Sequence, residues 1–216
     1  MELVRIDTQR AYRSIWDQIT TLQLAPGSLI DEARLAESLH MGLDPVREAL
    51  RLLAHEQLVA ITPRHGLYIA DVNTPDLEQL SEMRLAMEGL SARFAAQRTT
   101  PDDLVVLEAL RQEQATIPAE DSRRLFDLDH RFHQAIAQAA RNKYLADTLE
   151  RFFGLSQRLW YLALPHLGFL PSAVESHLDL VDAIKVGDAN RAEQIMRSHV
   201  EDFYGKVREV LSCLSR

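Results

Sequence analysis

Residues 41–59, MGLDPVREALRLLAHEQLV, constrain the fold most, because they specify a short helix with two different faces. Apolar residues recur there at helical spacing and predict a buried stripe, made of Val46, Ala49, Leu50, Leu53 and Ala54. Asp44 is the expected N-cap, and Pro45 is the expected first helical residue, where its missing N–H costs nothing. Arg47 and Arg51 project together from the opposite face.

The flanking residues predict further elements in a recognisable order. We expect a helix over 8–22, a short strand at 29–30 and a helix over 31–40 before this segment. Two strands, 59–62 and 67–70, follow it and are joined by PRHG. Helix, turn, helix and hairpin in this order predict a winged helix-turn-helix, the layout that places a recognition helix in DNA. Arginines on a helix face are usually only solvated, so the ordered set carries this interpretation.

The charge of the chain argues against a general attraction to nucleic acid. The formal net charge is −8, and residues 1–72 contain seven arginines, no lysine and ten acidic residues. Any contact with a phosphate backbone must therefore come from a local arrangement of side chains.

The rest of the chain reads as helix after NTPD at residues 73–76. The predicted segments are about 75–98, 102–116, 120–140, 143–164, 172–186 and 188–213, with breaks marked by Pro101, Pro118, Pro165 and Pro171. Six helices joined by short breaks predict an antiparallel all-α bundle. We therefore expect a mainly α chain with a winged helix-turn-helix domain at 1–72 and a helical domain at 73–216.

The sequence gives no sign of a membrane or secreted protein. No apolar stretch approaches the roughly 20 residues that span a bilayer, and the first residues lack the layout of a signal peptide. Cys213 is the only cysteine, so no internal disulfide can form. We expect a cytoplasmic protein without a membrane partner.

Polar residues interrupt the apolar stripe of FDLDHRFHQAIAQ, residues 126–138. Asp129 and His133 fall inside the stripe, whereas Asp127 and His130 lie on a polar flank.

His177 and His199 also lie among apolar residues, each on a later predicted helix. These residues and the Asp129–His133 pair can be separate buried groups, each with one hydrogen-bond partner, or the ligands of one shared ion. Three imidazoles and a carboxylate suit Zn²⁺, Ni²⁺, Co²⁺, Mn²⁺ or Fe²⁺ better than Ca²⁺ or Mg²⁺.

The stretch DPVREALRLLAHEQLVAITPRHGLYIADV resembles the winged-helix signature of the GntR family of bacterial transcription regulators, and the resemblance covers residues 8–72. It implies DNA contacts from the start of the second helix, the recognition helix and the wing tip. The implied residues are Arg34, Arg47, His65 and Gly66, with Arg51 and Arg64 as additions. The family usually has Ser/Thr-Arg-Thr before the proline, where this chain has Gly42-Leu43-Asp44, so a base-reading arginine and a phosphate-binding hydroxyl are missing.

Residues 77–212 resemble the FCD effector-binding domain of the FadR branch of that family. The matching motif residues are Asp129-x-x-Phe132-His133, Ala-x-x-Ala-x-x-Asn142, His177 and His199. The resemblance implies a divalent metal, Zn²⁺ or Ni²⁺ above all, held by Asp129, His133, His177 and His199, with a small carboxylate effector completing its coordination. Six helices rather than seven place the chain near the shorter, vanillate-regulator-like branch.

Arg84 occupies a position where this domain often has an arginine that reaches the ligand cavity. It can pair with an effector carboxylate, or it can form a surface ion pair with Glu88, four residues further on.

The resemblance implies a ligand-responsive regulator, a repressor, that binds two-fold operator DNA as a homodimer. Two other functions remain for the Asp/His₃ set: a metal-dependent hydrolase, in which an open coordination position activates water, and a pure metal sensor. No motif places a separate general base or nucleophile, which disfavours the hydrolase.

Overall fold

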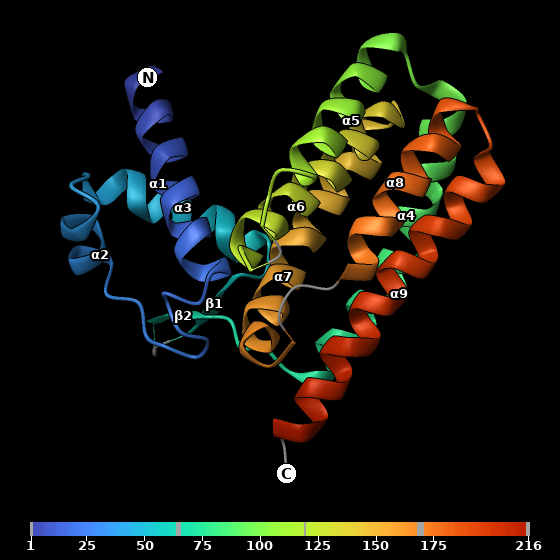
Figure 1. The fold of residues 1–216 in the computed structure, drawn as a ribbon. Helices are drawn as coiled ribbons and strands as arrows, with labels where there is room; N and C mark the ends of the chain where they lie inside the picture. The colour runs from blue at the N-terminus through green and yellow to red at the C-terminus, as the bar shows by residue number, and fades with distance from the viewer. Residues whose placement is uncertain (1, 64–65, 119, 168–170, 215–216) are drawn as a thin grey trace. The chain divides into compact units, whose positions relative to one another are not determined.

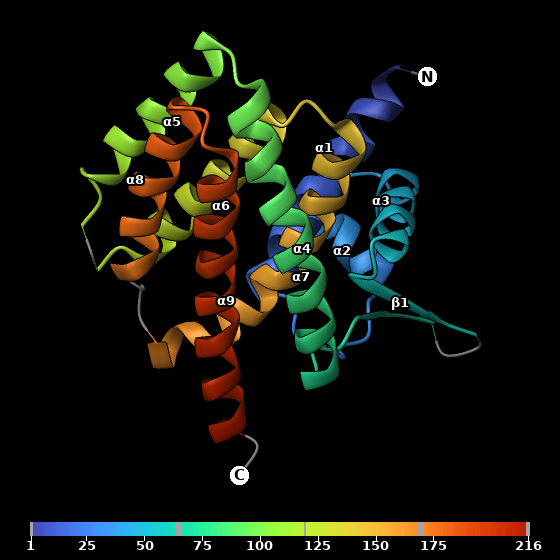
Figure 2. The same cartoon turned by 90° about the vertical axis from the view of Figure 1, so that its right-hand side faces the viewer.

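The computed structural model describes residues 2–63, 66–118, 120–167 and 171–214, which are mainly helical (Figures 1 and 2). Their contacts divide the chain into two compact units. Unit 1 comprises Met1–Asn73 with Gly154–Leu162, and unit 2 comprises Thr74–Phe153 with Ala163–Arg216. One long helix, α7, therefore contributes residues to both units.

Unit 1 begins with three helices, α1 (Glu2–Thr20), α2 (Glu32–Ser38) and α3 (Leu43–His55). Helices α1 and α3 pack against each other because both carry a buried apolar stripe, formed by Ala11, Ile15 and Ile19 on α1 and by Val46, Ala49, Leu50 and Leu53 on α3. Asp31 caps α2 by accepting hydrogen bonds from the backbone N–H groups of Ala33 and Arg34, both at 3.0 Å.

The start of α3 differs from the sequence prediction. Gly42 is the N-cap, and it forms no side-chain cap hydrogen bond, so the prediction of Asp44 as the N-cap is wrong. Pro45 is consequently the third residue of the helix rather than the first. The first-turn N–H groups have no intrahelical acceptor, so a proline is tolerated at this position too.

An antiparallel hairpin of β1 (Val59–Thr62) and β2 (Gly66–Ile69) follows α3, with Val59 opposite Ile69. The predicted strand at 29–30 is reduced to a single bridge between Leu29 and Tyr68. The hairpin completes the winged helix-turn-helix that the sequence predicts, and Val59 and Ile69 lie in its apolar core.

The chain after residue 73 forms the six predicted helices, of which α7 is shared between the units: α4 (Thr74–Arg98), α5 (Pro101–Gln114), α6 (Ser122–Ala139), α7 (Lys143–Leu167), α8 (Pro171–Lys185) and α9 (Ala189–Leu214). Thr100 and Asp103 form a capping box at the start of α5. Gly187, at φ +74°, follows the end of α8. Asp188 precedes α9 and accepts a hydrogen bond from the backbone N–H of Arg191 at 3.0 Å. The predicted break at Pro165 is wrong, because α7 continues to Leu167.

The helices of unit 2 form a bundle in which α4 lies along α9, as Figure 2 shows. Helix α6 packs against α4 and α5, while α8 packs against α9 and α5. The side chains between them form a dense core, with Phe132, Ile136, Val181, Met196 and Val200 at most 1% exposed. In the part of the chain that the structure describes, no helix combines the length and apolarity needed to cross a membrane.

Candidate metal centre and DNA-binding surface

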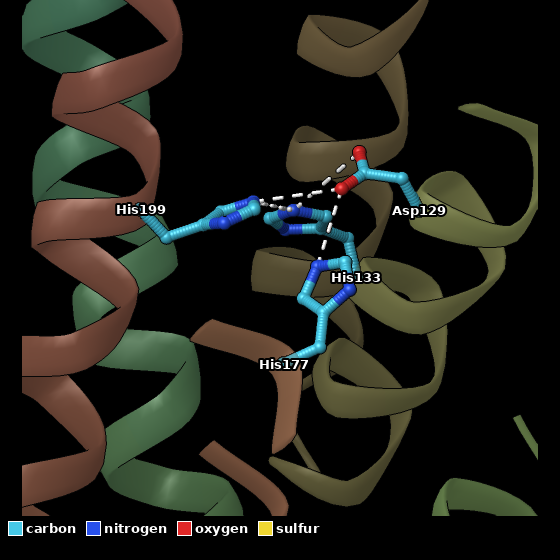
Figure 3. A group of neighbouring side chains, drawn as sticks. All are labelled: Asp129, His133, His177 and His199. Carbon is cyan, nitrogen blue, oxygen red and sulfur yellow. Dashed lines mark hydrogen bonds and ion pairs between the residues drawn. The ribbon is translucent and has the colours of Figure 1, made fainter. Parts of the chain in front are cut away.

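Asp129 and His133 lie one turn apart on α6 and both point into the bundle (Figure 3). The helix begins after Asp121, which accepts a hydrogen bond from the N–H of Arg124, and it buries Leu128, Phe132 and Ile136. The two polar side chains share this inward face because residues four apart are neighbours on a helix. Their placement follows the sequence prediction for α6.

His177 on α8 and His199 on α9 meet the α6 pair from the other side (Figure 3). Oδ1 of Asp129 lies 3.2 Å from Nε2 of His177 and 3.5 Å from Nε2 of His199. The Nε2 atoms of His133 and His199 are 3.1 Å apart. One ligand atom from each of the four residues therefore lies within 4.8 Å of the others.

The contacts inside this cluster suit a cation better than hydrogen bonds alone. Nε2 of His177 is buried and forms no hydrogen bond, although a carboxylate oxygen of Asp129 lies nearby. A buried nitrogen lone pair without a donor is costly, and a metal ion would satisfy it. Imidazole nitrogens and one carboxylate are the donor set that divalent transition metals prefer. The four residues thus fit a metal site.

The protonation states of the cluster differ between its members. Burial lowers the pKa of His177 to about 4, so this ring is neutral at neutral pH, as a metal ligand must be. Burial also opposes charge on His133 and Asp129, but their neighbours outweigh it. Glu88 and Asp129 raise the pKa of His133, while the charge of His133 holds the pKa of Asp129 well below its usual value.

The outer side of His133 contacts a buried ion pair formed by Arg84 and Glu88. Nδ1 of His133 lies 2.9 Å from Oε2 of Glu88, and Arg84 donates to Oε1 of Glu88 at 2.7 Å. Of the two alternatives that the sequence left open for Arg84, the surface ion pair holds only in part: Arg84 pairs with Glu88, but the pair is buried rather than at the surface, because the residues are 4% and 2% exposed. Helix α4 packs against both α6 and α9, so more than one of its faces is covered.

Gln114 makes the corresponding outer contact to His177. Its Oε1 lies 3.1 Å from Nδ1 of His177, and the residue is buried near the end of α5. Neither the contact of Glu88 with His133 nor the role of Gln114 is predicted by the sequence. Both contacts join residues at least 45 positions apart, and no local pattern signals such pairs.

The polar flank of α6 stays outside the cluster, as predicted. Asp127 is exposed, and His130 contacts Glu150 at 3.1 Å and stacks on Phe153 at 3.8 Å between ring centroids. A cavity of about 190 Å³ adjoins this flank and reaches the Glu88 side of His133. Other residues that line it are Gln134, Gln138, Asp147, Glu150 and Phe153. Asn142 caps the start of α7 by accepting a hydrogen bond from the N–H of Leu145 at 3.3 Å.

The predicted DNA-contacting residues of unit 1 lie on α2, α3 and the hairpin. Arg34 on α2 is exposed. Arg47 and Arg51 are exposed on α3, where each pairs with a carboxylate: Arg47 with Glu32 at 3.1 Å and Arg51 with Glu48 at 3.2 Å. Exposed ion pairs of this kind contribute little to the free energy of folding, so each arginine can leave its carboxylate for another partner.

Gly66 is the described one of the three predicted wing-tip residues. Gly66 begins β2 at φ +103°, a conformation that favours glycine, and it is exposed. Arg64 and His65, the other two wing residues named from the sequence, lie outside the described residues.

Comparison with known protein families matches both halves of the chain. Residues 7–69 match the family described as "Bacterial regulatory proteins, gntR family", and residues 79–202 match the FCD domain. The second match alone covers more than half of the chain.

Two relatives are named transcriptional repressors, and the similarity extends over most of the length of each. The Escherichia coli repressor RspR is 29% identical over 203 residues, covering 94% of this chain and 89% of that protein. The E. coli repressor GlaR is 27% identical over 198 residues, covering 88% of this chain and 90% of the relative.

Solved structures share the fold. E. coli McbR/YncC has a TM-score of 0.76 at 22% identity and covers 92% of this chain and 97% of its own. A GntR regulator from Rhodococcus sp. RHA1 has a TM-score of 0.76 at 19% identity, covering 94% and 97%. Because these relatives are named transcriptional repressors and the family consists of regulatory proteins, the chain is not a hydrolase. The chain belongs to the GntR family of bacterial transcription regulators, in the FadR branch that carries a C-terminal FCD domain.

Proposed function

We propose that this regulator is a cytoplasmic repressor that binds a two-fold operator as a homodimer and responds to a small carboxylate bound at a metal ion. The observation that carries the proposal is the buried Asp129/His133/His177/His199 cluster, in a chain whose other half is a winged helix. In a homodimer, two winged helices would meet half-sites about one helical turn of DNA apart. The names of RspR and GlaR support repression.

The four residues of the cluster would hold a divalent transition metal, Zn²⁺ or Ni²⁺ first, with Mn²⁺, Co²⁺ or Fe²⁺ as alternatives. The ion would link α6, α8 and α9 and offer a coordination position to an effector oxygen. The chain supplies the rest of the environment, because Asp129 provides one negative charge and neutral His177 provides a lone pair at neutral pH.

Arg84 is our candidate for a contact to the acid group of the effector. Burial of its guanidinium lowers the pKa of Arg84, but the nearby charges of Glu88 and Asp129 contribute to an opposite effect that outweighs it and raises the pKa. A guanidinium has five N–H donors, so it can hold Glu88 and an effector oxygen together. The 190 Å³ cavity beside His133 has Glu88, Asp147 and Glu150 in its lining, which would repel a carboxylate. We therefore assign the acid group to the metal side of the site.

The operator would be contacted by Arg34, Arg47 and Arg51 on the helices and by Arg64, His65 and Gly66 at the wing. The exposed ion pairs of Arg47 and Arg51 would open so that their donors reach the DNA. Because Gly42-Leu43-Asp44 replaces the usual Ser/Thr-Arg-Thr, the operator is expected to differ from those read by that arginine.

A thermal-shift screen of small carboxylates on metal-loaded and chelator-stripped protein tests the proposal. A ligand at a hundred times its Kd adds about 2.7 kcal/mol to the free energy of unfolding. An acid that stabilises only the loaded protein supports the proposal. A response to the metal with no response to any acid favours a pure metal sensor, and no response to either contradicts the sensing half of the proposal.

A further inference from the structure

Each histidine of the cluster must present the correct nitrogen if it is to bind an ion. A neutral imidazole carries one proton, so Nε2 can bind a metal only when the proton resides on Nδ1. In His133 and His177, Nε2 faces Asp129 and Nδ1 faces away from the cluster. The groups that contact these two Nδ1 atoms therefore determine which nitrogen is offered.

Glu88 on α4 contacts Nδ1 of His133 at 2.9 Å, and both residues are at most 5% exposed. An ionised carboxylate can only accept hydrogen bonds. Glu88 is ionised because it forms a buried ion pair with the guanidinium of Arg84 at 2.7 Å. Nδ1 of His133 is therefore the donor to Glu88, and Nε2 can present its lone pair to the cluster.

Arg84 fixes the orientation of Glu88. Its Nη2 and Nε donate to Oε1 of Glu88 at 2.7 and 3.3 Å, while Oε2 accepts from His133. Each carboxylate oxygen thus has its own buried donor, and rotation of the carboxylate would break both contacts. Two charged groups on α4 hold one ring on α6 in a single orientation.

Gln114 on α5 does the same for His177 without a charge. Its Oε1 accepts from Nδ1 at 3.1 Å, and the ring of Phe132 stacks on the imidazole with centroids 4.4 Å apart and planes 12° apart. The amide fixes the nitrogen that carries the proton, and the stacking fixes the ring plane.

We propose that Glu88 and Gln114 are positioning residues of the metal centre, which hold His133 and His177 with Nε2 toward the ion, and that Arg84 keeps Glu88 in place. This inference rests on the proposed metal binding by the four-residue cluster. Outer partners of metal-bound histidines typically change metal affinity by about 10- to 100-fold. The charge of Glu88 also makes His133 a better electron donor than a neutral partner would.

The test measures Zn²⁺ affinity of the full-length protein by competition with a chromophoric chelator, together with the visible absorption spectrum after Co²⁺ loading. Glu88→Gln is expected to weaken Zn²⁺ binding about 10- to 100-fold and to alter the Co²⁺ bands. Gln114→Met, which removes the acceptor, is expected to weaken binding as well. Gln114→Glu keeps an acceptor and adds charge, so affinity should equal or exceed that of the wild type.

Two further variants separate a loss of metal affinity from a loss of folding and from a general effect of removing a carboxylate. Glu88→Gln leaves Arg84 buried without its charged partner, so Arg84→Met/Glu88→Gln removes both charges at once and decides the outcome if the single variant does not fold. Glu113→Gln is the matched control, because it removes a carboxylate that pairs with Arg131 on the exposed side of α5 and α6. Circular dichroism establishes that each variant is folded.

Weakened Zn²⁺ binding and altered Co²⁺ bands in the folded Glu88 and Gln114→Met variants, with Glu113→Gln unchanged, support the inference. Wild-type affinity and spectra in those variants overturn it while leaving the proposed metal site intact. A wild-type protein that binds neither ion overturns the inference and the metal part of the proposed function together.

Discussion

Arg47 on α3 donates from Nε to Oε2 of Glu32 on α2 at 3.1 Å, so the two helices of the DNA-binding motif are linked through a residue predicted to contact DNA. The pair is partly exposed, with 46% of the arginine side chain and 29% of the glutamate side chain accessible. It therefore contributes little to the stability of unit 1. The arginine can exchange this partner for a phosphate or a base edge. A substitution of Arg47 therefore tests DNA binding with little effect on the stability of unit 1.

Arg47→Ala is expected to weaken binding to operator duplexes by about 5- to 150-fold, because one base or phosphate contact is worth about 1–3 kcal/mol. The duplexes can be selected from a random DNA library with the wild-type protein, and affinity measured by fluorescence anisotropy at fixed salt. Metal content should be unchanged, because Arg47 belongs to unit 1 and the Asp/His₃ cluster to unit 2. Loss of metal in this variant would contradict the view that DNA binding and metal binding belong to separate units.

Removal of the metal is expected to lower the thermal unfolding temperature. An ion at a thousand times its Kd adds about 4.1 kcal/mol, which corresponds to about 8–16 °C for a chain of this size. His177→Ala should abolish this metal-dependent shift because it removes a ligand. His130→Ala should retain it, since His130 contacts Glu150 and Phe153 outside the cluster. Equal shifts in the two variants would contradict the ligand assignment.

Phe132→Ala is expected to reduce the free energy of unfolding by about 3–5 kcal/mol, because the side chain is fully buried in the core. Urea denaturation of chelator-stripped protein measures this loss without a contribution from metal. Ile136→Val, one helical turn away and equally buried, should cost only about 0.5–1.5 kcal/mol. A similar loss in both variants would mean that Phe132 is less tightly packed than the structure indicates.

The capping box at the start of α5 makes a pH-dependent contribution to stability. Burial opposes the charge of Asp103, but hydrogen bonds from Thr100 and the ion pair with Arg141 at 2.6 Å outweigh it and lower its pKa. A carboxyl whose pKa is lower in the folded state stabilises the fold above its unfolded pKa, about 3.9, and loses this effect as the pH falls through its folded pKa.

Asp103→Asn should therefore cost stability at neutral pH, about 0.5–2 kcal/mol for a lost cap contact. The difference from the wild type should begin to shrink below about pH 4, where the carboxyl of the unfolded chain starts to be protonated, and should disappear below the folded pKa. Urea denaturation of stripped protein at several pH values measures this difference. A constant difference across that range would show that the charge of Asp103 is unimportant.

Local sequence patterns were sufficient to predict the helices and to identify the face of α6 that points into the bundle. Val46, Ala49, Leu50 and Leu53 recur at helical spacing, and the four-residue spacing of Asp129 and His133 places both on one face. Spacing alone left two interpretations of the four polar groups open, because it does not relate α6 to α8 and α9. The family resemblance supplied the ligand set.

Only the tertiary structure decided which groups surround that set. Arg84 and Glu88 are charged residues that would face solvent on an ordinary amphipathic helix, but α4 packs against both α6 and α9 and buries them. Their pairing with His133, like that of Gln114 with His177, joins helices across 45 and 63 residues of sequence. The sequence determined which helices form and which of their faces are apolar, because those depend on nearby residues. The partner of each buried polar group depends on how distant helices pack, and no local pattern contains that information.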